Sequence, residues 1–521
     1  MTLPASPQDI ADATWADLEP FYDALIAAPM DDPRAWLRDW SALEEIVEEA
    51  GTLAMIAYTC DTADPAKEAA HLRWSSEIFP RAVEKQVLLA RRLVESGYSE
   101  PGLDVALRGF RTDIEIFREE NIPLFSELEG LVASYQRITG GLQVDWNGEA
   151  KTVPQLQPYL KERDRAVREK AFRLGAQAYL AKRDEMASLF TEMYEKRQQV
   201  ARNAGFPDFQ AYAFRAKHRF DYTPADCAAF HRAVEATVVP AVERLMAHRR
   251  ERLGLDVLRP WDTQVELAGE RPLRPFSDAA GLVEPARRVF RALDPELGDQ
   301  FDRMAAEGLL DLESRPGKAP GGYCTKLPWR GMPFIFMNAV GVPDDVSTLV
   351  HEAGHSFHDF AAHRQPLVWQ RSVTHEAAEL ASMSMELLVA PHLAQPTGYY
   401  PPDEARTAWC EHLEDILVTL AHIASVDAFQ AWIYTSGRGH DAEARDAAWL
   451  DVRSRFERGV DWGGLERERV ARWYRQLHIF EYPFYYIEYG IAQLGALQLW
   501  RASLSDPAGT VRRYRAALAL G

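Results

Sequence analysis

The sequence is poor in cysteine and in positive charge. Its 521 residues contain four cysteines, which lie far apart and form no CxxC pair: Cys60, Cys227, Cys324 and Cys410. This spacing suggests neither a disulfide framework nor a thiolate zinc site, so we expect free thiols in a reducing compartment. The 59 Lys and Arg are outnumbered by 78 Asp and Glu, which gives a formal net charge of −19. Because nucleic acid and anionic membranes repel such a chain, neither is expected as a partner.

Targeting and membrane signals are also missing. No Lys or Arg precedes Arg34, whereas secretory and mitochondrial leaders need basic residues near their start. No stretch approaches about 18 uninterrupted apolar residues, so no membrane-spanning helix is expected. These absences predict a cytoplasmic protein.

Helix-forming residues are abundant. Ala, Leu, Glu and Arg dominate, and apolar residues recur at three- and four-residue spacing in 66–97, 155–203 and 223–253. Strand signals are few. The clearest is the apolar run 332–340, and the proline near its start favours an edge strand. The sequence therefore predicts a mainly α fold with a small amount of sheet.

A boundary is expected near residue 150. Asn147-Gly148 predicts the turn of a short hairpin, and Thr152 with Gln155 offers a capping box for the helix that follows. We therefore divide the chain into an N-terminal helical domain at 1–150 and a larger domain at 151–521.

The segment His351-Glu352-Ala353-Gly354-His355 carries the strongest chemical signal. On a helix, positions i and i+4 share one face, so both histidines can direct their imidazoles at one zinc ion. Glu352 lies beside that face, where its carboxylate reaches a metal-bound water without ligating the metal. The alternative interpretation is two ordinary histidines on an amphipathic helix. We favour a site for one zinc ion, with Glu352 as general base.

A catalytic zinc needs a third protein ligand. Residues 372–386 predict a second helix, on which Glu376, Glu379 and Glu386 share one face. A solvated charged face is the simpler interpretation of such a pattern. We favour Glu379 as the ligand and the other two as groups that orient the ligating imidazoles. Spacing by itself does not separate Glu376 from Glu379.

An aromatic segment near the C-terminus, residues 478–490, offers further donors. Such runs usually pack in a core. In a zinc hydrolase, however, phenol and imidazole groups can also hydrogen-bond the oxyanion that forms when water attacks a carbonyl.

Together the three segments resemble the thimet oligopeptidase and oligoendopeptidase F family of zinc metallopeptidases. HEAGHSFH at 351–358 resembles that family's HExGHxxH motif, and AELASMSMELL at 378–388 resembles its ExxS…E helix. LHIFEYPFYYIEYG at 477–490 resembles its C-terminal His/Tyr element.

The resemblance implies roles for individual residues. In the family's pattern the ligand is the glutamate followed three residues later by serine, which selects Glu379. His478, Tyr482 and Tyr489 match the substrate-binding and oxyanion positions of the His/Tyr element. The run at 332–340, with Asn338-Ala339 near its end, is expected to pair with the backbone of an extended peptide.

The resemblance spans roughly residues 150–521. It implies a neurolysin-like helical ellipsoid with a deep central channel and a small β-sheet next to the zinc site. The implied protein is a cytoplasmic zinc endopeptidase that cleaves short unstructured oligopeptides, as a monomer or homodimer. Its catalytic domain at 151–521 is expected to have lobes that are discontinuous in sequence.

Two alternatives remain at this point. A helical zinc carboxypeptidase of the Taq type has a similar size, fold class and HExGH motif. Its HES-type third-ligand segment is not matched by HEAAELAS at 375–382. An inactive helical scaffold would bind peptides without cutting them, and it would have no need of Glu352.

Overall fold

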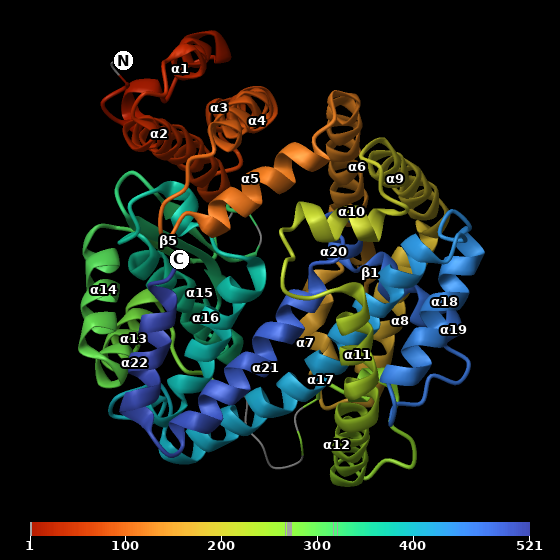
Figure 1. The fold of residues 1–521 in the computed structure, drawn as a ribbon. Helices are drawn as coiled ribbons and strands as arrows, with labels where there is room; N and C mark the ends of the chain where they lie inside the picture. Colours follow the sequence, from red (N-terminus) through yellow and green to blue (C-terminus); the bar gives the residue numbers. More distant parts are fainter. Residues whose placement is uncertain (1–2, 266, 268–272, 316, 320) are drawn as a thin grey trace. The chain divides into compact units, whose positions relative to one another are not determined.

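The computed structural model describes residues 3–265, 267, 273–315, 317–319 and 321–521. In these residues the chain is mainly helical and has a three-stranded sheet and a separate two-stranded hairpin (Figure 1). The predicted fold class, mainly α with a small sheet, is confirmed. The four cysteines are free thiols, as expected.

The chain forms two compact units, each built from segments that are distant in sequence. The first unit comprises Met1–Glu115, Leu273–Cys410 and Ile491–Gly521, and the second comprises Ile116–Pro272 and Glu411–Gly490. The predicted division of the chain into domains at 1–150 and 151–521 is not tested by these two units and stays a prediction.

The helices and strands that begin in the first unit are α1 (Trp15–Ala27), α2 (Pro33–Cys60), α3 (Pro65–Leu72), α4 (Phe79–Ser96), α5 (Asp104–Ile116), α13 (Ala279–Leu293), α14 (Pro295–Ala306), β3 (Leu310–Glu313), β4 (Tyr323–Leu327), β5 (Met332–Ala339), α15 (Pro343–Ala362), α16 (His375–Leu388), α17 (Pro402–Thr435) and α22 (Pro507–Leu518).

Those that begin in the second unit are α6 (Ile122–Gly140), β1 (Gln143–Trp146), β2 (Glu149–Thr152), α7 (Gln157–Leu160), α8 (Arg165–Ala181), α9 (Arg183–Asn203), α10 (Phe209–Ala216), α11 (Pro224–Ala233), α12 (Val239–Arg252), α18 (Ala442–Phe456), α19 (Glu466–Tyr474), α20 (Leu477–Phe480) and α21 (Tyr486–Ser503).

The hairpin expected near residue 147 is present. Strands β1 and β2 pair antiparallel, with Trp146 opposite Glu149. Asn147 and Gly148 between them have φ values of 58° and 90°. Positive φ at both central residues is the conformation that an Asn-Gly hairpin turn requires.

The sheet of the first unit corrects one prediction. Its strand order is β3-β5-β4, so β5 is the central strand and not an edge strand. Pro333 fits this position because β3 does not pair with β5 at this residue, so the missing N–H of proline costs no hydrogen bond between these two strands. Ile335, two residues later on the same side of β5, donates to Leu309 at 3.0 Å, and pairing with β3 begins only at Ile335.

An apolar core joins α15 and α16 to this sheet. Leu349, Ala353 and Phe357 of α15 share one buried cluster with Ile335 of β5 and Met385 of α16. The three apolar positions of α15 are four residues apart, so they line one face of the helix. The HEAGH segment is therefore held on a rigid helix that packs against the sheet.

Helix α17 is long and apolar enough to meet the composition criteria for a membrane span. Its most apolar 18-residue window has a mean hydropathy of 1.5, and 61% of that window is buried inside the protein. Core helices of water-soluble proteins meet the same criteria, so the finding is weak evidence for a membrane.

Candidate active site

The start of α15 is fixed directly behind the sheet. Pro343 occupies the first turn, and Asp345 Oδ2 accepts the backbone N–H groups of Val340, Gly341 and Val342 at 2.8–2.9 Å. A carboxylate and a proline are both favourable at a helix N-terminus. The helix that carries the HEAGH segment therefore begins at a defined point after β5.

Gly354 allows α15 and α16 to lie unusually close together. A Cβ atom at Gly354 would lie 2.5 Å from Ser382 Cα and 2.9 Å from the Ala381 carbonyl oxygen. Both neighbours are backbone atoms of α16, so a side chain at this position would force the helices apart. The glycine inside the motif thus sets the spacing between the two helices.

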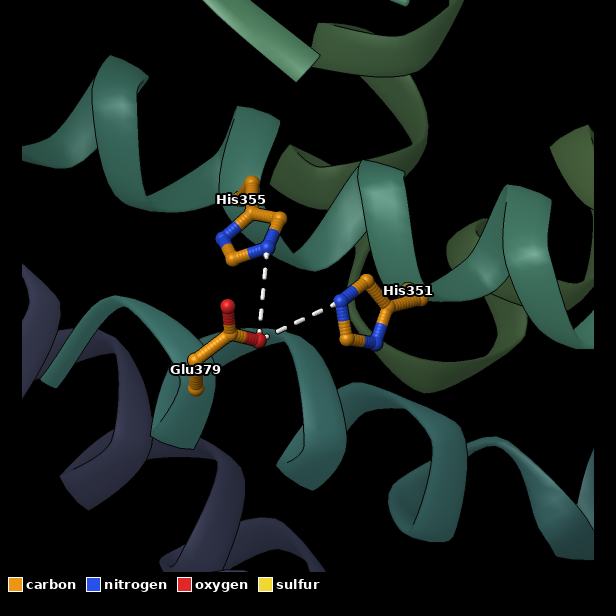
Figure 2. Close-up of side chains that lie close together, drawn as sticks. All are labelled: His351, His355 and Glu379. Carbon is orange, nitrogen blue, oxygen red and sulfur yellow. Dashed lines mark ion pairs between the residues drawn. The ribbon is translucent and has the colours of Figure 1, made fainter. Parts of the chain in front are cut away.

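Three side chains meet between these helices. Figure 2 shows His351 and His355, one turn apart on α15, facing Glu379 of α16. Glu379 Oε2 lies 3.4 Å from His351 Nε2 and 3.8 Å from His355 Nε2. One donor atom from each of the three residues falls within 4.8 Å of the other two. The structure therefore brings together the three residues predicted as metal ligands.

This donor set fits a zinc ion. Tetrahedral zinc with bonds of about 2.0–2.1 Å to nitrogen and oxygen separates neighbouring ligand atoms by roughly 3.3 Å. The two measured separations from Glu379 Oε2 are close to that value. Two imidazoles and one carboxylate are also a common protein ligand set for catalytic zinc.

Neighbouring groups fix the orientation of both rings. His351 Nδ1 lies 2.7 Å from Glu386 Oε1, which leaves Nε2 facing Glu379. The ring of His355 is hydrogen-bonded to the backbone of Ala378. Contacts of this kind hold ligating imidazoles in one tautomer. Glu386 therefore lies where the sequence predicts an orienting carboxylate, whereas the orienting role of the partly buried Glu376 stays a prediction.

Electrostatic coupling within the cluster is strong. Burial disfavours a charged imidazole, but hydrogen bonds to Glu379 and Glu386 hold the pKa of His351 well above its ordinary value. Burial, followed by the nearby charge of His351, lowers the pKa of His355 to about 4. Hydrogen bonds, burial and nearby charges thus shift the pKa values of the two histidines in opposite directions.

Glu352 is buried next to the triad. Burial raises the pKa of its carboxyl to about 7, against the opposing charge of His351. The carboxylate accepts a hydrogen bond from the backbone of Cys324 in β4. Cys324 is opposite Ile335, whose N–H points toward β3, so the N–H of Cys324 points away from β5. The outer edge of β4 therefore faces Glu352.

The residues predicted for substrate pairing are engaged within the protein. Asn338 Nδ2 donates to the carbonyl oxygens of Ala319 at 2.7 Å and Gly321 at 2.9 Å. Ala339 is paired with Glu313 of β3. Asn338 thus anchors the segment that leads into β4, and a contact between these residues and substrate stays a prediction.

The predicted His/Tyr element lies in the second unit. Its rings form one cluster, in which His478 lies 6.2 Å from Tyr482 and 6.1 Å from Tyr489, measured between ring centroids. Tyr485 lies 5.1 Å from Tyr489. Tyr482 is 57% exposed, whereas His478 and Tyr489 are partly buried. The structure brings the three predicted residues together, and their catalytic roles stay predictions.

Buried polar side chains that the sequence analysis missed hold the backbone of this element. Arg197 donates to the carbonyl oxygens of Ile479 and Phe480, and Gln430 Oε1 accepts the N–H of Phe484 at 3.2 Å. Arg219 donates to the carbonyl oxygen of Phe484.

Phe484 has a φ of 63°, a conformation that non-glycine residues rarely adopt. The hydrogen bonds to its N–H and its carbonyl therefore stabilise a strained turn between His478 and Tyr489. The sequence did offer a signal for Arg197. It falls on the buried stripe of α9 between Met193 and Ala201, where an arginine needs partners.

Comparisons with known proteins agree with this architecture. The sequence profile of Peptidase family M3 matches residues 159–521, and that of the Peptidase M3 N-terminal domain matches residues 11–101. Oligopeptidase PepF of Bacillus subtilis strain 168 is 24% identical over 284 residues, which are 53% of this chain and 40% of the Bacillus protein. The oligoendopeptidase F homolog of Borreliella burgdorferi is 23% identical over 293 residues, which are 53% of this chain and 47% of that protein.

The alignments therefore span less than half the length of these two relatives. The solved structure of PZ peptidase A with inhibitor 2 is similar over 100% of this chain and 92% of that chain, with a TM-score of 0.88 and 25% identity. The predicted family resemblance is confirmed, since the family profile matches well over half of the chain. The chain belongs to peptidase family M3.

Proposed function

We propose that the chain is a zinc-dependent endopeptidase that hydrolyses short unstructured oligopeptides. The observation that carries this proposal is the His351, His355 and Glu379 cluster with the buried Glu352 beside it. Membership of a metallopeptidase family supports it. A Taq-type carboxypeptidase and an inactive scaffold are the alternatives.

His351 Nε2, His355 Nε2 and Glu379 Oε2 are the atoms that would hold the metal. When bound, zinc supplies Lewis acidity, which activates water as a nucleophile and polarises a carbonyl group. Glu386 contributes by holding His351 Nδ1, so that the Nε2 lone pair stays directed at the site. We assign Glu376 to the same kind of support.

Glu352 is the proton carrier of the proposed reaction. Its carboxylate accepts a proton from the attacking water and delivers it to the nitrogen of the departing amine. A carboxyl whose pKa is raised to about 7 is suited to take up and release a proton near neutral pH. The hydrogen bond from Cys324 restrains the carboxylate while it does so.

The His/Tyr element supplies hydrogen-bond donors in this proposal. Tyr489 stabilises the negative charge that develops on the carbonyl oxygen, and His478 and Tyr482 position the peptide. One well-placed donor of this kind contributes about 10²–10³ in rate. The clustering of the three rings supports the assignment.

Strand β4 is a better candidate than β5 for pairing with an extended substrate. Both sides of β5 are occupied by strands, whereas no described strand pairs with the outer edge of β4. That edge faces Glu352 through Cys324. A peptide added to the sheet there would lie next to the proton carrier.

An internally quenched peptide blocked at both ends tests the function. A zinc-loaded endopeptidase cleaves it, and cleavage excludes both a carboxypeptidase and a binding scaffold. Glu352→Gln is the matched control, because it is expected to bind the peptide without cutting it. Failure of the zinc-loaded wild type to cleave any blocked peptide in a varied set would refute the proposal.

A further inference from the structure

Lys217 lies against the His/Tyr element, and no carboxylate among the described residues forms an ion pair with its ammonium group. It follows the last residue of α10 and is partly buried. Its Nζ atom lies 5.5 Å from the centroid of the Tyr485 ring. Within the part of the chain that the structure describes, this Nζ atom makes no hydrogen bond or ion pair. A partly buried ammonium group without an acceptor is energetically costly.

The nearby carboxylate is already engaged. Glu488 Oε1 accepts two hydrogen bonds from Arg219, at 2.9 and 2.5 Å, and both side chains are almost completely buried. Glu488 Oε2 accepts the hydroxyl of Tyr222 at 2.7 Å. Burial and the positive charge of Arg219 lower the pKa of Lys217 to about 8, although Glu488 opposes this shift.

The position of Lys217 suggests which kind of ligand its ammonium group would bind. Tyr485, which it faces, lies 5.1 Å from Tyr489 and 5.8 Å from His478, measured between ring centroids. An ammonium group offers three hydrogen-bond donors and accepts none, so its natural partner is an anion. The anionic group that a peptide can offer is a carboxylate.

We propose that Lys217 binds a carboxylate of the peptide substrate. Peptides that carry a carboxylate at the position facing Lys217 are then the preferred substrates. This inference rests on the proposed peptidase function, since it takes the His/Tyr element to contact substrate. The carboxylate has two sources, the free C-terminus and an acidic side chain. A cation that only complements the C-terminal end of the α10 dipole is the structural alternative.

The test uses the whole zinc-loaded chain and a series of matched pairs of one peptide. Fluorophore and quencher are attached to side chains, so that both ends remain variable. The first pair has a free or an amidated C-terminus and contains no acidic residue. In each further pair both peptides are amidated, and they carry either Glu or Gln at one position that differs from pair to pair. The expected result is a preference of about 10- to 100-fold in kcat/KM for one carboxylate peptide over its neutral partner.

Variants separate recognition from folding. Lys217→Met should remove the preference by raising KM for the carboxylate peptide, with little change for the neutral one, and Lys217→Arg should restore part of it. Lys170→Met is the matched control. The Nζ atom of Lys170 also lies over an aromatic ring, 4.8 Å from the centroid of the Trp146 ring. Lys170 is exposed, however, and its Nζ donates a hydrogen bond to Asn147 Oδ1. The Lys170→Met variant should leave the preference for carboxylate peptides unchanged.

Either of two selectivity results would overturn the inference. One is a wild type that treats both members of every pair alike. The other is a Lys217→Met variant that loses activity equally on both. Fluorescence anisotropy with zinc-loaded Glu352→Gln measures binding without cleavage. A wild type that neither cleaves nor binds any of the peptides would refute the proposed function, and the role of Lys217 with it. Binding that prefers carboxylates without cleavage would refute only the endopeptidase activity.

Discussion

Glu352 is the residue on which the proposed chemistry depends. It is buried and accepts a hydrogen bond from the backbone of Cys324. A glutamine has the same shape and can still accept that bond, but its amide cannot take up a proton. We predict that Glu352→Gln keeps one bound metal ion and loses peptide hydrolysis by about 10²–10⁴-fold. Metal content and turnover are measured on the same sample. Near-normal turnover in a metal-loaded variant would contradict the role of Glu352.

Substitutions of Glu379 and Glu376 compare a proposed metal ligand with a residue proposed to orient a ligating imidazole. The structure places Glu379 Oε2 3.4 Å from His351 Nε2 and 3.8 Å from His355 Nε2, which favours Glu379 as the ligand. Glu379→Gln should therefore lose the metal. Glu376→Gln should retain it with affinity lowered by at most about 10–100-fold. Metal analysis after dialysis against a mild chelator decides between them. Loss of metal from Glu376→Gln alone would show that the ligand assignment is wrong.

The two histidines of the candidate metal site could be predicted from sequence because their spacing is local. His351 and His355 are separated by one helical turn, so any helix brings them together. The choice of Glu379 over Glu376 depended on the family pattern, because spacing alone leaves both on the same face. Lys217, by contrast, lies beside Tyr485, a residue far away in the sequence, and no local pattern indicates that contact.

At the scale of elements, the approach of α15 to α16 determines whether the cluster forms. We predict that Gly354→Ala destabilises the protein by about 1–3 kcal/mol, because the new Cβ overlaps backbone atoms of α16. The displaced helices should also weaken metal binding by about tenfold or more. Thermal unfolding and a chelator competition assay measure the two effects.

Gly130→Ala in α6 is the matched control for this prediction. Apart from its chain neighbours and the backbone of its own helix, a Cβ at Gly130 would meet no described atom within 4 Å, so alanine should stabilise the helix by about 0.5–1 kcal/mol. If Gly354→Ala binds metal as tightly as the wild type does, the close helix approach is not required for the site.

The error about β5 also belongs to the scale of elements. Its apolar residues predict a strand correctly, but the edge position inferred from its proline is wrong. Whether a missing N–H matters depends on where the neighbouring strand begins, and β3 pairs with β5 only from Ile335 onward. That register is set by contacts between segments, which the sequence of one strand does not contain.

At the scale of the whole molecule, the two units interleave in sequence. Each assembles from segments separated by at least 80 residues. The helical class was predictable from periodicity, but such an assembly depends on packing between distant helices and was expected only from the family resemblance. The deep central channel remains a prediction of the same origin.

That channel has a measurable consequence. A substrate would enter such a channel only as an extended strand, so this prediction expects unstructured peptides of up to a couple of dozen residues to be cleaved and folded proteins to remain intact. A folded domain could offer an extended segment only by local unfolding, at a cost of up to its global stability. A length series of one disordered sequence, assayed beside a stable folded protein, measures this. Rapid cutting of the folded protein would indicate an open cleft.

Titration of metal-free protein with zinc tests whether peptide hydrolysis depends on one metal ion at this cluster. Metal bound per chain and turnover of a peptide blocked at both ends are followed in the same samples. Because His351, His355 and Glu379 form one cluster, turnover should rise in proportion to bound zinc and reach its plateau at one ion per chain. Full turnover in the metal-free protein, or bound zinc at this cluster without any cleavage, would contradict the account.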